Sequence, residues 1–200
     1  LSISSFLINL AAIMEKADET LLPAVYREVG QELGASPSQL GYLTFIRAFV
    51  QSLSSPLAGF LALHYSRPTV VGFGTLFWAF STAGVAVSRN FTQCALWRAV
   101  NGMGLAIVIP ALQSFVADSN NENGRGLAFG WLNLVGCIGG IGGGTLATIL
   151  AGHTIWGYAG WRVAHMLVAL LSSIIGLLVH VFVIDPKERV PGFRKHHHDG

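Results

Sequence analysis

The chain has 200 residues, of which 52% are hydrophobic and only 11% are charged, and its formal net charge is +2. Soluble globular domains carry about 25% charged residues, so the composition excludes an ordinary soluble domain and predicts an integral, multi-pass membrane protein. A net charge this small argues against a nucleic-acid partner, because phosphate backbones are bound by many Lys and Arg side chains.

Six long apolar segments follow one another, separated by polar or helix-ending stretches such as GASPS, HYSRP and DSNNENGRG. Backbone polar groups inside a bilayer must be hydrogen-bonded within their own segment, so these segments are predicted to be helices. Barrel strands would need only about 9–11 alternating residues. The predicted spans are 3–26, 39–63, 69–88, 92–116, 126–152 and 161–184. The predicted fold class is therefore an all-α bundle of six transmembrane helices over residues 1–184.

The loops on the two sides of the membrane differ in positive charge. One side holds Arg67, Arg125, Lys187, Arg189, Arg194 and Lys195. The other side holds Arg27, Arg89 and Arg162. Because cytoplasmic loops carry the excess of Lys and Arg, we expect the N-terminus to be cytoplasmic. Residues 185–200 would then be a cytoplasmic linker or tail.

Four ionisable residues interrupt the first span. Glu15, Asp18 and Glu19 stand at i, i+3 and i+4 and therefore share one helical face, whereas Lys16 lies about 100° round from Glu15. A charge at the bilayer centre costs at least about 2.5–3.5 kcal/mol, so such groups turn towards partners or water. One interpretation is structural, with Lys16 and Glu19 reaching the membrane surface. The other is a polar cavity for substrate or protons.

Two further spans carry an arginine and a second polar residue one turn later. Arg47 is followed by Gln51 in the second span, and Arg98 by Asn101 in the fourth. We expect these spans and the first to line one cavity, in which the positive and negative charges neutralise one another. The predicted substrate or proton site consists of Glu15, Asp18, Glu19, Arg47, Arg98 and Asn101.

The fifth span is rich in glycine at helical spacing. Gly136, Gly140 and Gly144 stand at i, i+4 and i+8, with Gly139 and Gly143 on the adjacent ridge. Small residues at this spacing let two helices approach closely in lipid, which predicts a close and mobile helix interface. The run follows no strand and lacks the P-loop lysine, so a nucleotide-binding loop is not expected.

The fourth span, LWRAVNGMGLAIVIPALQSFVADS, resembles the fourth helix of major facilitator superfamily transporters. In that helix an Arg is followed by Gly-x-Gly, here Arg98, Gly102 and Gly104. The segment NGRGLAFG and the glycine run of the fifth span are similar to further motifs of the family, as is GWRVAHMLVALLSSIIGLLV followed by DPKER. When these motifs are considered together with the first two spans, the chain is most similar to plant-type spinster-like members. Pro56 and Pro110 are expected to bend the second and fourth helices.

The loop between the second and third spans departs from the family pattern. It keeps Gly59 and Arg67 of the motif Gly-x-x-x-Asp-Arg-x-Gly-Arg but has Leu63 at the Asp position. The resemblance implies that this loop closes the cytoplasmic side, so closure here should differ or be weaker. Asp118 with Arg125 is a candidate to supply part of it. Gly59, Arg67, Asp118 and Arg125 are therefore the predicted cytoplasmic gate residues.

The resemblance implies twelve helices in two halves that rock about a central site, with this chain as the N-terminal half. The expected function is secondary active transport of a small organic solute or a lipid by alternating access, with proton coupling as an option. Asp18, with Glu15 or Glu19, would be the acidic element, Arg98 its basic partner and Arg47 a second positive site. The expected partners are the substrate, membrane lipids and a missing C-terminal half, with no cofactor and no metal.

Two other classes of function compete with transport. A membrane-embedded hydrolase would need a nucleophile beside a base, or clustered metal ligands. His165 and His180 are fifteen residues apart and form no such signature, so the chain is predicted not to be an enzyme. The remaining alternative is a six-helix channel, or a non-transporting regulatory half that dimerises.

Overall fold

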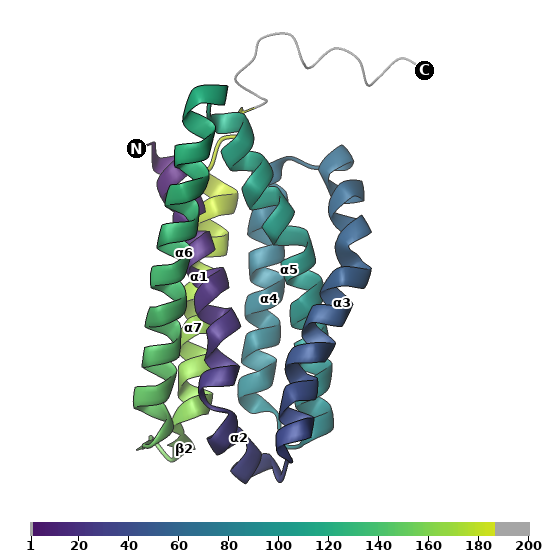
Figure 1. Cartoon of the computed structure of the whole chain (residues 1–200), viewed down its shortest axis with the longest axis vertical. Helices are drawn as coiled ribbons and strands as arrows, with labels where there is room; N and C mark the ends of the chain where they lie inside the picture. Colours follow the sequence, from purple (N-terminus) through teal and green to yellow (C-terminus); the bar gives the residue numbers. More distant parts are fainter. Residues whose placement is uncertain (1, 187–200) are drawn as a thin grey trace.

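The computed structural model describes residues 2–186, which are almost entirely helical (Figure 1). The helices are α1 (Ile3–Ala24), α2 (Tyr26–Leu33), α3 (Pro37–His64), α4 (Arg67–Val87), α5 (Phe91–Ser119), α6 (Glu122–Ala151) and α7 (Gly160–Phe182). Strands β1 (Thr154–Ile155) and β2 (Tyr158–Ala159) form an antiparallel hairpin between α6 and α7. The predicted all-α bundle is confirmed, and α2 and the hairpin are additions to it. The predicted tail lies outside the described residues, except for Asp185 and Pro186.

Five of the described helices, α3 to α7, are long and apolar enough to cross a membrane. Helix α1 has 22 residues, which is also sufficient for a bilayer of about 30 Å. It differs from the other five by its four ionisable residues, Glu15, Lys16, Asp18 and Glu19. These charges must therefore be explained by what α1 contacts inside the bundle.

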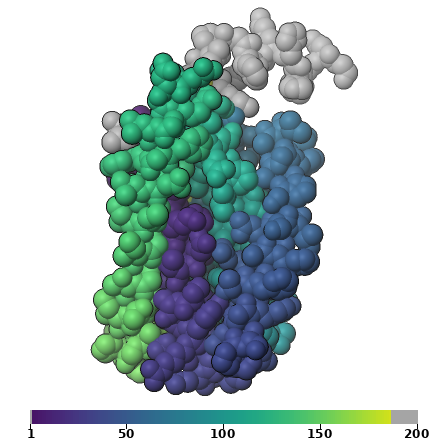
Figure 2. All heavy atoms as spheres, in the orientation of Figure 1, coloured from purple at the N-terminus to yellow at the C-terminus, as the bar shows by residue number. Residues whose placement is uncertain are grey.

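The six long helices run side by side, with α4 packed against both α5 and α7 (Figure 1). Helix α1 packs against α6 and α7, and α3 packs against α5. Helices α3 and α6 are the least buried by the other helices, and large apolar side chains along both are exposed. In Figure 2 the atoms of α1 form a strip between those of α6 and α3. The charged helix therefore lies between the two most exposed helices.

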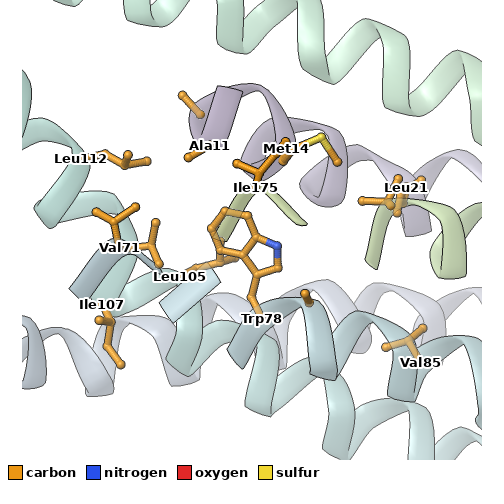
Figure 3. Close-up of a cluster of buried hydrophobic side chains, with 14 of the residues drawn as sticks. Ala11, Met14, Leu21, Val71, Trp78, Val85, Leu105, Ile107, Leu112 and Ile175 are labelled. Atoms are coloured by element: carbon orange, nitrogen blue, oxygen red, sulfur yellow. The ribbon is translucent and has the colours of Figure 1, made fainter. Parts of the chain in front are cut away.

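The apolar core is centred on Trp78 of α4, which is fully buried. Figure 3 shows its indole among apolar side chains from α1, α4, α5 and α7. Labelled neighbours in this cluster are Met14, Val71, Leu105 and Ile175. Because one side chain contacts elements far apart in sequence, the core holds α4 at the centre of the bundle.

Local sequence explains where several helices begin. Ser36 and Gln39 form a capping box at the start of α3, with N–H···O distances of 2.9 and 3.3 Å, and Pro37 occupies the first helical turn. Asn90 and Asn121 cap α5 and α6 by accepting a hydrogen bond from the backbone N–H three residues later. These caps fix the register from which the buried polar residues are presented.

The close interface between α1 and α6 depends on glycine. A Cβ at Gly139 would lie 2.8 Å from the Cα of Ile13, and a Cβ at Gly143 would lie 2.6 Å from the Cα of Ala17. The backbone of α1 lies further from Gly136, Gly140 and Gly144. The closest approach is therefore on the adjacent glycine ridge, because that ridge faces α1 directly.

Candidate functional site

The most deeply buried acid is Asp18 of α1, which is 2% exposed. Its Oδ1 accepts a hydrogen bond from Thr82 Oγ1 of α4 at 2.5 Å, and its Oδ2 accepts one from Asn101 Nδ2 of α5 at 2.9 Å. Asn101 Nδ2 also lies 3.4 Å from Thr82 Oγ1. Buried carboxylates are tolerated only when such partners replace water. The hydrogen bonds among Asp18, Thr82 and Asn101 therefore connect α1, α4 and α5.

Arg98 lies one turn before Asn101 on α5 and is 3% exposed. Its Nε and one terminal nitrogen have no hydrogen-bond partner among residues 2–186. The expected ion pair of Arg98 with Asp18 is not found in this part of the chain, and the carboxylate oxygens of Asp18 accept hydrogen bonds from Thr82 and Asn101 instead. A buried guanidinium with open donors is a ready binding group for an anion.

A second charged group lies between α1 and α3. Arg47 of α3, which is 8% exposed, has its Nη2 3.7 Å from Glu19 Oε1. Lys16 Nζ lies 2.8 Å from Glu19 Oε2 and 4.0 Å from Glu15 Oε1. Glu15 and Glu19 of α1 are therefore accompanied by two cations, one from their own helix and one from α3.

The six predicted site residues thus form two groups. We call them the inner group (Asp18, Arg98 and Asn101, with Thr82) and the outer group (Glu15, Glu19 and Arg47, with Lys16). Sequence reasoning missed Thr82. A threonine in a membrane helix usually bonds its own backbone, so its position in an apolar run carries no signal of a partner 64 residues away.

His165 of α7 is a further buried polar residue that sequence reasoning considered only for a hydrolase. It is 2% exposed; its Nδ1 hydrogen-bonds with the Trp161 carbonyl at 2.7 Å, and its Nε2 has no partner among the described residues. Within residues 2–186, no three His, Cys, Asp or Glu side chains are grouped as a metal site would require.

The glycines of α5 bring its neighbours close to the inner group. A Cβ at Gly102 would lie 3.2 Å from the carbonyl carbon of Arg47 on α3, and one at Gly104 would lie 3.0 Å from Trp78 Cβ on α4. Pro110 lies inside α5, further from these contacts. Gly102 and Gly104 therefore let α3 and α4 pack closely on α5 beside Arg98 and Asn101.

Arg67, at the first residue of α4, joins three segments at the end of the bundle that carries the N-terminus. Its guanidinium forms ion pairs with Asp118 of α5 and, at 3.6 Å, with Asp185 after α7. Its Nε donates to Ser114 Oγ at 2.8 Å, and its backbone N–H donates to Asp185 Oδ2 at 3.0 Å. We call this the Arg67 cluster.

The expected pairing of Asp118 with Arg125 is not the one observed. Asp118 pairs with Arg67, and Arg125 Nε instead donates to the Ala117 carbonyl at 3.0 Å. Gly59 faces open space on α3. Of the four predicted gate residues, the structure therefore brings Arg67 and Asp118 together and leaves Gly59 apart.

The opposite end has its own cluster, centred on Arg162 at the start of α7. Its Nη2 lies 2.8 Å from Glu32 Oε1 of α2, and its Nη1 donates to the carbonyls of Ala86 and Ser88 at 2.8 and 2.7 Å. Trp161 Nε1 donates to Glu32 Oε2 at 2.6 Å, and the guanidinium lies 4.4 Å from the Trp161 ring centroid. This Arg162 cluster fixes α2, which the sequence did not predict, onto α4 and α7.

The chain is similar to several known proteins. The profile of the Major Facilitator Superfamily matches residues 1–198. The chain is 26% identical over 170 residues to "Quinolone resistance protein NorA" of Staphylococcus aureus, covering 82% of this chain and 41% of that protein. It is 25% identical over 177 residues to "Cis,cis-muconate transport protein" of Acinetobacter baylyi, covering 88% and 41%. The chain thus spans about four-tenths of the length of these relatives.

Solved structures show the same fold. A bacterial homolog of the human lysosomal transporter Spinster, in an inward-facing and occupied conformation, has a TM-score of 0.84 at 18% identity over 91% of this chain and 44% of that one. The inward-open xylose transporter XylE from E. coli has a TM-score of 0.78 at 13% identity over 92% and 48%. The described helices therefore correspond to somewhat less than half of each neighbour.

Proposed function

The chain belongs to the Major Facilitator Superfamily, and on that premise we propose that it is the N-terminal half of a secondary transporter that works by alternating access. The matched family is one of transporters, and the muconate transport protein, the Spinster homolog and XylE are named as such, which agrees with the prediction that the chain is not an enzyme. Family membership and the apolar helices make it an integral, multi-pass membrane protein.

The observation that supports this proposal is the inner group. Asp18 is held by Thr82 and Asn101, while Arg98 beside it keeps donors without a partner among residues 2–186. An anionic substrate group, or a carboxylate released from its present partners, would satisfy these donors. Protonation of Asp18 would remove its charge, so proton coupling can act on the same residues. The outer group would line the entrance to this site through Glu19 and Arg47.

We assign the substrate to small organic solutes or lipids. The structural similarity to a Spinster homolog supports a spinster-like protein and favours a lipid. The exposed apolar side chains of α3 and α6 support a second six-helix half as the partner that covers them. The excess of Lys and Arg that the sequence shows in alternate loops and the tail supports a cytoplasmic N-terminus, and Gly59, Arg67, Asp118 and Arg125 would then belong to the cytoplasmic gate.

Uptake by the full-length protein in proteoliposomes tests this function. Candidate organic anions and lysophospholipids are screened with and without a pH gradient, and Asp18→Asn and Arg98→Gln are compared with wild type. Each variant should reduce uptake at least about tenfold, as expected for the loss of one buried charged contact. Glu122→Gln and Arg27→Gln remove exposed charges outside the site and should leave uptake unchanged.

Three results would contradict the proposal. The first is wild-type uptake by both site variants. The second is an uptake rate that does not saturate as the substrate concentration rises, which would indicate a channel. The third is loss of uptake only in variants that elute as aggregates during size-exclusion chromatography, which would indicate a structural role.

A further inference from the structure

A groove on the outside of the bundle lies where α4 ends and α7 begins. It has a volume of about 580 Å³ and is bounded by the last turn of α4, the β1–β2 hairpin and the first three turns of α7. Its floor is apolar and consists of Val163, Met166, Leu167 and Leu170. None of its lining residues belongs to the inner or outer group. The groove is therefore separate from the proposed transport site.

The turn of the hairpin beside this groove has a tryptophan, Trp156, at a position with an unfavourable backbone conformation. Trp156 has φ 50° and Gly157 has φ 82°, so both turn residues adopt the left-handed conformation. Such turns favour Asn-Gly, because a bulky residue is strained at positive φ. Trp156 is nevertheless 90% exposed and gains no buried packing within residues 2–186, and Tyr158 is 65% exposed. Trp and Tyr at the end of membrane helices typically lie at headgroup depth.

The rim of the groove is positively charged. Arg89 and Arg162 both line it, and its lining residues include no Asp or Glu. Arg162 is paired with Glu32, whereas the guanidinium of Arg89 has no ion pair within residues 2–186. One positive charge at the mouth of an apolar groove is therefore available for a ligand.

We propose that this groove is a binding site for one anionic phospholipid of the surrounding leaflet. An acyl chain lies along the floor from Val163 to Leu170, the phosphate faces Arg89, and the rings of Trp156 and Tyr158 lie beside the glycerol region. The floor excludes a purely polar ligand, and the rim favours a net negative headgroup over a zwitterionic one. The bound lipid would bridge the hairpin to α4 and α7, next to the Arg162 cluster.

The test uses the full-length protein and an equimolar mixture of phosphatidylglycerol and phosphatidylcholine. Native mass spectrometry counts the lipids that remain bound. A phosphatidylglycerol with a photoreactive acyl chain identifies the site, which should be labelled within residues 163–170. Arg89→Gln should weaken phosphatidylglycerol binding about fivefold, as expected for one Arg near an anionic headgroup. Arg27→Gln, which removes an exposed Arg at the same end but outside the groove, should leave binding unchanged.

A second variant separates lipid binding from folding. Trp156→Asn gives the turn the sequence it prefers, so the melting temperature should stay equal or rise. Labelling of residues 163–170 should nevertheless fall, because the indole is lost. Equal retention of the two lipids by wild type would overturn the proposal. Unchanged binding in Arg89→Gln, or an equal loss in Arg27→Gln, would do the same.

Discussion

At each end of the bundle an arginine connects several helices, but its partners differ between the two ends. The Arg67 cluster depends on carboxylates, Asp118 and Asp185, which come from α5 and from the segment after α7. Arg162 instead donates to two backbone carbonyls at the end of α4 and, among residues 2–186, pairs with a single carboxylate, that of Glu32. Backbone carbonyls do not titrate or change rotamer. The Arg162 end is therefore connected largely through backbone carbonyls, and the Arg67 end largely through carboxylates.

This difference is compatible with the proposed alternating access, in which one end of the bundle opens at a time. The ion pair of Arg67 with Asp118 can be exchanged for water or other partners at small net cost, because the Asp118 side chain is 39% exposed and surface pairs contribute about 0–1 kcal/mol. An arginine that also satisfies buried carbonyls cannot be released so easily, because the carbonyls would lose their donors. The Arg67 end is therefore the end that we expect to move.

The largest effect is expected for Arg162→Ala. This change removes two bonds to backbone carbonyls, the pair with Glu32 and the contact with Trp161, and should destabilise the protein by about 3 kcal/mol. Thermal unfolding in detergent measures the loss. Arg162→Lys keeps the charge but cannot reach all three acceptors, so it should recover less than half of the stability. A loss below about 1 kcal/mol, within the range of an exposed pair, would contradict the difference between the ends.

A smaller effect is expected for Arg67→Ala. The side chain loses its ion pairs and its bond to Ser114, but the backbone N–H of residue 67 still donates to Asp185. The expected loss is about 1–2 kcal/mol. The matched control is Arg125→Ala at the same end, which removes a single bond to a carbonyl and should change the melting temperature less. A loss for Arg67→Ala equal to that for Arg162→Ala would remove the distinction.

Asp118→Asn should have a smaller effect still. The Asp118 side chain is 39% exposed, so its ion pair with Arg67 should contribute less than about 1 kcal/mol to stability. We expect a small change in melting temperature and faster hydrogen exchange of the backbone amides at this end. Unaltered exchange at the start of α4 and the end of α5 would show that this pair does not hold the two helices together.

The smallest expected effect is that of salt. Ion pairs with an exposed partner are screened at high ionic strength, whereas bonds to buried carbonyls are not. Raising NaCl from 0.1 to about 1 M shortens the Debye length from about 10 to 3 Å and should increase exchange more at the Arg67 end than at the Arg162 end, where salt screens the pair with Glu32 but not the bonds to carbonyls. Equal responses at both ends would indicate that both are held by the same kind of contact.

The sequence predicted the long helices well, because their length and apolar composition are set by the membrane and can be read locally. It also placed Asp18 and Asn101 among the buried polar residues. The partner Thr82, the Arg67–Asp118 pair and the choice of Gly139 and Gly143 as the closest ridge depend on tertiary packing, which no local pattern encodes. Helix α2 and the hairpin are too short to give a periodic signal.

Asp118 illustrates the limit most clearly. Its nearest positive residue in sequence is Arg125, seven residues later, and local reasoning therefore paired the two. In the structure the turn between α5 and α6 carries Arg125 back to the Ala117 carbonyl, while Arg67 reaches Asp118 from another helix. Spatial proximity between helix ends, rather than separation along the chain, decided the partner.

The central claim is that the inner group is the transport site, and a double-mutant cycle on uptake tests it most directly. The full-length protein is compared with Asp18→Asn, Arg98→Gln and the combination of the two, all at equal amounts of inserted protein. If Asp18 and Arg98 act on the same step, the uptake rate of the double variant should equal that of the less active single variant, because the second substitution removes no further interaction. Uptake by the double variant at the wild-type rate would contradict the claim and assign these buried charges a structural role.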